Sequence, residues 1–173
     1  MRQSFSLLLA AVMGAQMLAA PAMATASSCM KPAEREAFEL AGLKSELTNL
    51  ALACKQQDRF NTFMTTYKPA MVSDYTALNA YFRRVYGKQG QAKYDEYITN
   101  LSGEQEIEAL KSGTAFCMVV PQMFDEVMAL HDSTELAGYA RSQALVQPIS
   151  LDECAAPPVK TKAKARARSK KKA

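Results

Sequence analysis

The sequence has few of the side chains that most enzymes and metal sites use. Histidine occurs once, at His131, so a histidine metal site would need acids or cysteines to complete it. The four cysteines form no C-x-x-C pair, and the closest two are 25 positions apart, which favours neither a redox motif nor a zinc site. No G-x-S-x-G motif is present, and His131-Asp132-Ser133 are sequence neighbours, whereas the groups of a triad converge from separate elements. We therefore expect no catalytic residue, no metal and no cofactor.

Signals for sheets, repeats and further membrane spans are also missing. No stretch shows sustained alternation of apolar and polar residues with β-branched enrichment, so we expect essentially no sheet. No internal repeat has solenoid spacing. Beyond the N-terminal segment, no apolar run approaches the roughly 18 residues that a membrane span needs.

The N-terminal segment has the three parts of a secretory signal peptide. A basic start at Arg2 precedes an apolar run over residues 7–18, and small residues suit cleavage after Ala24 or Ala26. The alternative is an uncleaved membrane anchor, but the segment contains a glutamine and a proline and is only marginally long for a span. We expect a signal peptide over residues 1–24 and a periplasmic or secreted protein.

Charge divides the mature chain into two parts. Residues 25–159 carry 12 Lys/Arg and 17 Asp/Glu, a net charge of −5, whereas residues 160–173 carry eight Lys/Arg and no acid. The basic segment has no large apolar residue and cannot bury a core. We expect a helical domain over residues 25–156 and a disordered basic tail over residues 157–173.

The tail is the one segment whose composition indicates a partner. Its clustered cations attract polyanions, which in a cell envelope are an anionic membrane surface or an acidic polymer. No aromatic residue interleaves them, so base stacking is not offered and no specific nucleic acid is predicted. The alternative is a solubilising tail without a specific partner. The predicted anion-binding residues are Lys160, Lys162, Lys164, Arg166, Arg168, Lys170, Lys171 and Lys172.

Apolar residues recur with helical spacing throughout the body. Leu40, Leu43, Leu47 and Leu50, for example, follow a 3-4-3 pattern that forms one apolar stripe. The fold class is therefore all-α, a disulfide-stapled bundle of about six short helices. The expected helices cover about 32–54; 60–67; 69–86, ended by Gly87; 94–101, closed by Ser102-Gly103; 103–128, broken at Pro121; and 132–147, opened by Asp132 and ended by Pro148.

The four cysteines are interpreted as structural disulfides. Cys54 and Cys117 fall on apolar stripes and are expected to point into the core, whereas Cys29 and Cys154 flank the folded body. Four cysteines allow three pairings, and sequence alone does not choose among them. Their environments favour an inner Cys54–Cys117 pair and an outer Cys29–Cys154 pair.

The remaining candidate residues are interpreted as ordinary surface or core positions. Three methionines spaced by five, Met118, Met123 and Met128, do not stack on one helix face, so core filling is favoured over a copper site. Ordinary amphipathic packing is favoured for the tyrosines in the middle of the chain, although Tyr81 and Arg83-Arg84 lie off the core stripe and a binding surface is the alternative for them. The acids that a hydrolase would need are interpreted as solvated; they are Glu34, Glu36, Glu39, Asp95, Glu96, Glu104, Glu106, Glu108, Asp125 and Glu126.

The order of these features resembles that of uncharacterised secreted four-cysteine helical proteins of Gram-negative bacteria. The likeness lies in the export signal, Cys29 with Pro32 opening a Glu-rich helix, and Cys54 at its end. It continues through Tyr81-Phe82-Arg83-Arg84-Val85-Tyr86-Gly87, Phe116-Cys117, Phe124-Asp125-Glu126-Val127-Met128-Ala129-Leu130, Cys154 and the Lys/Arg/Ala tail. The resemblance implies an exported location and no known activity.

Together these features favour an exported, non-enzymatic binding or structural module of the cell envelope whose tail contacts anionic surfaces. Two alternatives stay open. One is a small carboxylate-dependent glycan hydrolase. The other is a holdase or carrier for apolar ligands, which would need an exposed apolar groove.

Overall fold

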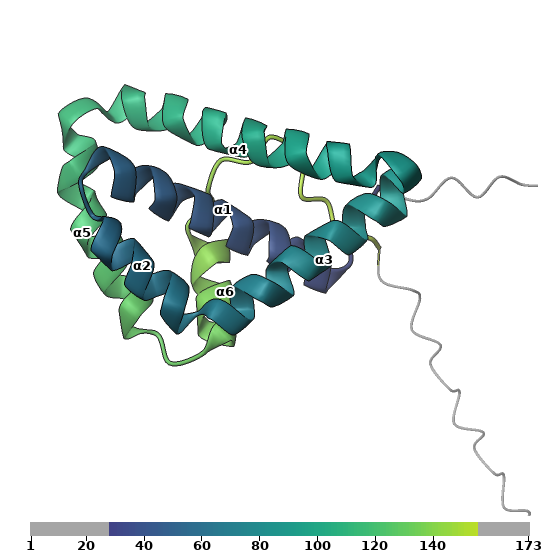
Figure 1. Cartoon of the computed structure of the whole chain (residues 1–173), viewed down its shortest axis with the longest axis horizontal. Coiled ribbons are helices and arrows are strands. Elements are labelled where there is room, and N and C mark those ends of the chain that lie inside the picture. The colour runs from purple at the N-terminus through teal and green to yellow at the C-terminus, as the bar shows by residue number, and fades with distance from the viewer. Residues whose placement is uncertain (1–27, 156–173) are drawn as a thin grey trace, which may run out of the picture.

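The computed structural model describes residues 28–155, and within them the fold is all-α (Figure 1). The predicted signal peptide, residues 1–24, and the predicted tail, residues 157–173, lie outside the described residues. None of the helices in the described part is long and apolar enough to cross a membrane. The helices are α1 (Pro32–Ala53), α2 (Gln57–Thr66), α3 (Lys68–Tyr86), α4 (Gly90–Ser112), α5 (Phe116–Ala129) and α6 (Ser133–Ser142).

Helix α1 lies at the centre of the bundle, and the other five helices all contact it (Figure 1). The predicted leucine stripe is buried, but the middle of α1 is buried on every side, from Ala37 through Leu43. Two apolar clusters therefore share this helix. Leu47 and its neighbours pack on α2, α5 and α6, whereas Phe38 packs edge-on against Tyr81 of α3 and Tyr97 of α4.

Two glycines shape the tight connection between α3 and α4. Gly87 ends α3, as predicted, with a φ of +56°, a left-handed conformation that glycine adopts without strain. At Gly90 a Cβ atom would lie 2.9 Å from the backbone of Arg83, so only glycine allows the helices to approach this closely. The turn sets α3 and α4 side by side.

The predicted end of the fourth helix at Ser102-Gly103 is wrong. Helix α4 continues without a break to Ser112, and Gly103 is an interior residue of it. Gln105 explains the continuation, because its side chain is buried and its amide donates a hydrogen bond of 3.0 Å to the carbonyl of Gly42 in α1. Packing against the central helix thus outweighs the low helix propensity of one glycine.

The last two helices also differ from the sequence prediction at their ends. A single helix, α5, covers residues 116–129, so no restart occurs near residue 121. Helix α6 begins as predicted, since the Asp132 carboxylate caps it by accepting from the N–H groups of Thr134 and Glu135. It ends at Ser142, well before Pro148, with Ala144 at a φ of +46° just beyond.

The segment after α6 runs back across α1 as an irregular strap, residues 143–155. Gln147 fixes it, because its amide donates to the carbonyl of Phe38 at 3.0 Å and its side-chain oxygen accepts from the hydroxyl of Tyr97 at 2.9 Å. A Cβ atom on Gly42 would lie 2.4 Å from this amide nitrogen, so the glycine makes room for it. The strap then reaches Met30, which forms an isolated parallel bridge with Glu153.

Two disulfides staple the bundle, with the pairing that the residue environments favoured. Cys29 and Cys154 join the two ends of the body, with Cα atoms 4.9 Å apart. Cys54 and Cys117 join the end of α1 to the start of α5, with Cα atoms 5.5 Å apart. The expected inner location of this second bridge is wrong, because Cys117 is exposed and Cys54 is only partly buried. Disulfides of this kind persist in oxidising compartments.

Candidate functional site

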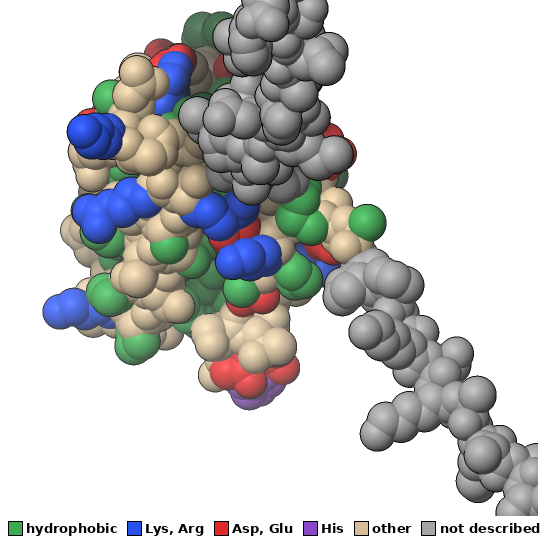
Figure 2. Space-filling view, turned by 90° about the vertical axis from the view of Figure 1, so that its right-hand side faces the viewer, with side chains coloured by type: hydrophobic (Ala, Val, Ile, Leu, Met, Phe, Trp, Pro, Cys, Tyr) green, Lys and Arg blue, Asp and Glu red, His purple; other side chains and the backbone are tan. Residues whose placement is uncertain are grey.

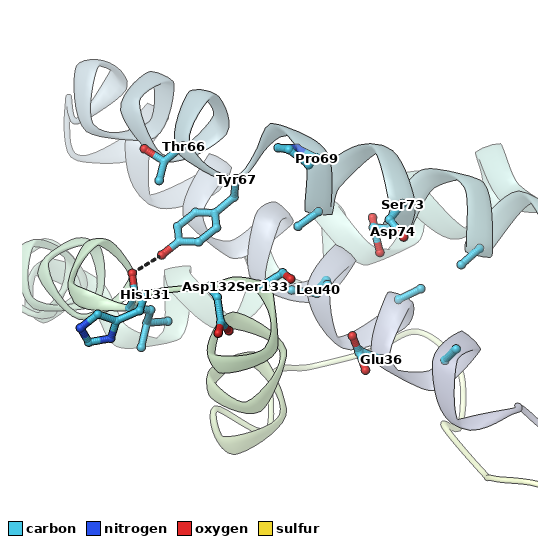
Figure 3. Close-up of a pocket in the computed structure, with 15 residues that line it drawn as sticks. Glu36, Leu40, Thr66, Tyr67, Pro69, Ser73, Asp74, His131, Asp132 and Ser133 are labelled. Atoms are coloured by element: carbon cyan, nitrogen blue, oxygen red, sulfur yellow. Dashed lines mark hydrogen bonds between the residues drawn. The ribbon is translucent and has the colours of Figure 1, made fainter.

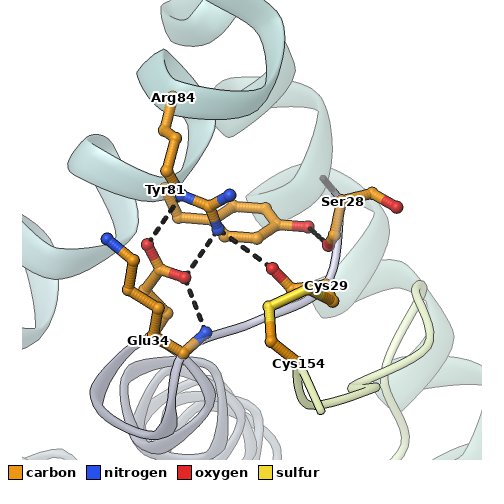
Figure 4. Close-up of a disulfide and its surroundings, with 7 residues drawn as sticks. Ser28, Cys29, Glu34, Tyr81, Arg84 and Cys154 are labelled. Carbon is orange, nitrogen blue, oxygen red and sulfur yellow. Dashed lines mark hydrogen bonds and ion pairs between the residues drawn. A yellow bond between two sulfur atoms is a disulfide. The ribbon is translucent and has the colours of Figure 1, made fainter. Parts of the chain in front are cut away.

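Two of the three α3 residues for which a binding surface was the alternative fix the N-terminal end of the body in place (Figure 4). Tyr81 is buried and donates a hydrogen bond of 2.9 Å to the carbonyl of Ser28. Arg84 lies over the Tyr81 ring and donates to the carbonyl of Cys29 and to both carboxylate oxygens of Glu34. Arg83 alone stays exposed. The surface reading is therefore wrong for Tyr81 and Arg84.

Two of the candidate carboxylates are buried ion-pair partners and not solvated groups. Burial raises the pKa of Glu34, but the hydrogen bonds from Arg84 and from the Lys31 N–H outweigh it, and the net pKa is lowered. Glu39 is also buried, and it accepts from Arg35 at 2.8 Å and from Arg141 at 2.9 Å. Both acids hold elements together.

The other candidates lie where the sequence placed them, with two exceptions, Glu126 and Met118. The remaining acids are exposed except Glu126, which is partly buried and accepts from the Tyr139 hydroxyl at 2.8 Å. His131 is 85% exposed and is held by Glu135, which accepts from its backbone N–H at 2.8 Å. Met123 and Met128 pack on the core, but Met118 is exposed and fills nothing.

A cavity of about 470 Å³ opens between α1, α3 and the connection from α5 to α6 (Figure 3). Apolar and polar side chains both line its walls, and the polar groups come from all three sides. The lining residues that matter for its chemistry are Glu36, Tyr67, Asp74, His131 and Asp132. The Tyr67 hydroxyl is already committed, because it donates towards the carbonyls of Val127 and Leu130.

Asp74 is the unusual group in this cavity. Asp74 is only 4% exposed, and its Oδ1 atom is buried without a hydrogen-bond partner. Burial raises its pKa from 3.8 to about 7, and the Lys44 charge opposes that rise only in part. An unpaired carboxylate in an apolar setting is costly, so structures rarely retain one without a reason.

Sequence reasoning missed Asp74, although the pattern contains a signal for it. The residue lies three positions after Met71 and four before Leu78, so it shares the buried face of α3 with both. The acids singled out from the sequence are all interpreted as helix first-turn or polar surface positions, and Asp74 is not one of them. An acid on an apolar stripe is the kind of position where a perturbed pKa is expected.

The cavity contains one of the groups that an acid catalyst requires. A general acid for glycoside cleavage needs a raised pKa, which Asp74 has, and a second carboxylate about 5 to 9 Å away. Glu36 and Asp132 line the same cavity, but Asp132 is engaged in capping α6. Within residues 28–155, no group of three or more His, Cys, Asp or Glu side chains is placed to hold a metal ion.

A second hollow lies at the opposite end of α1, beside the Cys54–Cys117 bridge. It measures about 620 Å³ and is bounded by α1, α4 and the start of α5. Two large apolar side chains that line it are exposed, Leu52 at 65% and Leu110 at 73%. Such a cluster is the kind of surface that a carrier of apolar ligands would need.

Comparisons of the chain with protein-family models, with curated proteins and with solved structures found no match. The two disulfides and the helices are thus the features that characterise it: it is a helical protein with two disulfide bridges.

Proposed function

We propose that this chain is an exported, non-enzymatic binding module of the cell envelope, similar to the secreted four-cysteine helical proteins that its sequence resembles. In this proposal a signal peptide directs the chain to an oxidising compartment, where both disulfides form. The basic tail then contacts an anionic membrane surface or an acidic envelope polymer. The segregation of charge supports the proposal most directly, since the body carries −5 and residues 160–173 carry +8.

The body carries a net charge of −5, which disfavours its contact with anionic surfaces. On the face shown in Figure 2, Lys and Arg side chains are spread among polar and apolar atoms and form no continuous patch. Several of the body's arginines are also engaged with carboxylates, as Arg35, Arg84 and Arg141 are. Attraction to polyanions is therefore assigned to the tail.

Deletion of residues 160–173 tests this proposal. We expect the full chain to sediment with vesicles containing anionic lipid in low salt and the deletion variant to stay in solution, because each cation near the surface contributes about 1 kcal/mol. Raising the salt to about 0.5 M should release the full chain, since screening shortens the reach of the charges. A matched control replaces the eight cations by glutamine at constant length. Equal retention of the full chain and the deletion variant would contradict the proposal.

The hydrolase alternative is favoured by one observation, the raised pKa of Asp74 in a cavity that two other carboxylates line. Zymography on purified peptidoglycan separates the two classes of function. Our proposal predicts no clearing by the wild-type protein. Clearing that Asp74→Asn abolishes would overturn the proposal and identify an enzyme.

The carrier alternative is favoured by the apolar hollow beside the Cys54–Cys117 bridge. A fluorescent apolar probe that brightens on binding would detect such a site. Displacement of the probe by fatty acids, together with its loss in Leu110→Lys, would support a carrier. The same substitution at Val72, which is exposed elsewhere on α3, is the matched control.

A further inference from the structure

We propose that the cavity between α1, α3 and the α5–α6 connection binds a small organic cation, an ammonium group on a short apolar body, with Asp74 as its counter-ion (Figure 3). This site goes beyond the proposed envelope role, because it requires neither the tail nor export. Failure of either proposal leaves the other standing.

The first reason is the state of Asp74. Its buried Oδ1 atom accepts no hydrogen bond, and no ion pair joins it to another residue between positions 28 and 155. Lys44 is near enough for its charge to be felt, but it does not reach bonding distance. An ammonium donor in the cavity would supply both the missing hydrogen bond and the missing charge.

The second reason is the sign of the charge around the cavity. Three acids line it, Glu36, Asp74 and Asp132, and no lysine or arginine is among the lining residues that the structure describes. His131 is the one basic side chain there, and it lies at the exposed rim beside Glu135. The field inside therefore attracts cations and repels anions.

The third reason is the apolar part of the walls. It consists of alanine, leucine and proline side chains, which can pack against a chain of methylene groups. The volume of about 470 Å³ falls in the usual range for small-molecule sites. The wall residues are Ala33, Ala37, Leu40, Pro69, Ala70, Ala77 and Leu130.

The ionisation of Asp74 makes binding depend on pH. Its carboxyl titrates near pH 7 in the empty cavity, so about half of the molecules carry the charge at that pH. Charged groups from α1 also face Asp74, namely Lys44 and Glu36. On α4, burial and then the Asp74 charge raise the pKa of Tyr94 and of Tyr97, so both hydroxyls stay neutral in this range. The His131 imidazole at the rim is the other group to control for, through His131→Gln.

Calorimetry with n-pentylammonium as the probe and n-pentanol as its neutral counterpart tests the site. We expect the ammonium to bind the wild-type chain at pH 8 and pentanol to bind at least about tenfold more weakly. Lowering the pH from 8 to 6 should weaken ammonium binding about tenfold, since the ionised fraction of Asp74 falls by about that factor. Amide NMR shifts should locate the probe at α1 and α3.

Two variants test the charge of Asp74 and the volume of the cavity separately. Asp74→Asn keeps the size of the side chain, removes a buried charge that disfavours folding, and should weaken ammonium binding at least tenfold. Ala77→Leu should weaken both probes by filling the cavity. Glu46→Gln is the control, because burial also raises the pKa of Glu46 but this residue lines a different hollow. Undiminished binding to Asp74→Asn, or no binding of the ammonium by the wild type up to about 10 mM, would overturn the proposal.

Discussion

The buried carboxyl of Asp74 destabilises the folded state when it is ionised. The carboxyl sits on the buried face of α3 between Met71 and Leu78, where an aliphatic side chain would pack without cost. Its pKa near 7 means that the folded chain holds a proton that the unfolded chain releases at its ordinary pKa of 3.8. The folded state therefore binds more protons between these two values.

Stability should fall as pH rises through this window. The free energy of unfolding is expected to drop between pH 4 and pH 8 by up to about 4 kcal/mol, because the unfolded chain gains stability by ionising Asp74 while the folded chain still holds the proton. The drop levels off above pH 7, where the carboxyl is ionised in both states. Urea unfolding at several pH values measures this. Asp74→Asn should remove the drop and be the more stable chain at pH 8, whereas Asp58→Asn on the exposed side of α2 should keep the wild-type profile. A wild-type profile that rises over the same window would contradict the assignment.

Helices were the part of the fold that the sequence predicted well, because their apolar spacing is a local property. The leucine stripe of α1 and the Gly87 stop of α3 both follow from residues that are neighbours in sequence. The predicted helix ends were wrong where a contact with a residue far away in the sequence determines how long the helix is. Ser102-Gly103 has the letters of a helix end, but Gln105 binds the Gly42 carbonyl 63 positions away and α4 runs on.

The contact between the start of α1 and the end of α3 depends on Arg84. Arg84→Met should lower the free energy of unfolding by about 2 to 4 kcal/mol, because it leaves the buried Glu34 carboxylate without its main partner. Chemical denaturation at pH 7 measures the loss. The neighbouring substitution Arg83→Met is the matched control, and it should change stability by less than about 0.5 kcal/mol since Arg83 is exposed.

Equal effects of the two substitutions would mean that the Arg84 network does not anchor the N-terminal end of the body. The double variant Glu34→Gln with Arg84→Met gives a further check. It should recover part of the stability that Arg84→Met loses, because it removes the orphaned charge as well as its partner.

At the scale of the molecule, the candidate site could not be predicted from the sequence. Its residues come from α1, from the junction of α2 with α3, and from the α5–α6 connection, so up to 100 positions separate them. The spacing of apolar residues predicts each helix by itself, but it does not predict how three elements pack or where a cavity remains between them. The disulfide pairing was more accessible, because the two outer cysteines flank the body and leave the other two to pair, yet the exposure of Cys117 depends on how α5 packs.

Both bridges close long loops, and both should contribute strongly to stability. The joined residues are 125 and 63 positions apart, for which chain-entropy estimates give roughly 5 and 4 kcal/mol as upper bounds. Replacing either pair by serine should therefore lower Tm clearly, and by similar amounts for the two pairs. Thermal unfolding followed by circular dichroism measures this. Ellman titration of the native and the denatured wild type should find no thiol, and two or more would refute the two-bridge assignment.

The Cys29–Cys154 bridge also has a mechanical consequence. It joins the two positions at which the chain enters and leaves the body, so a pulling force applied between them passes through one sulfur–sulfur bond. The helices between positions 29 and 154 carry no load while that bond is intact. Held at Cys29 and Cys154, the oxidised body should behave as a short inextensible link, and only a reductant would let it lengthen.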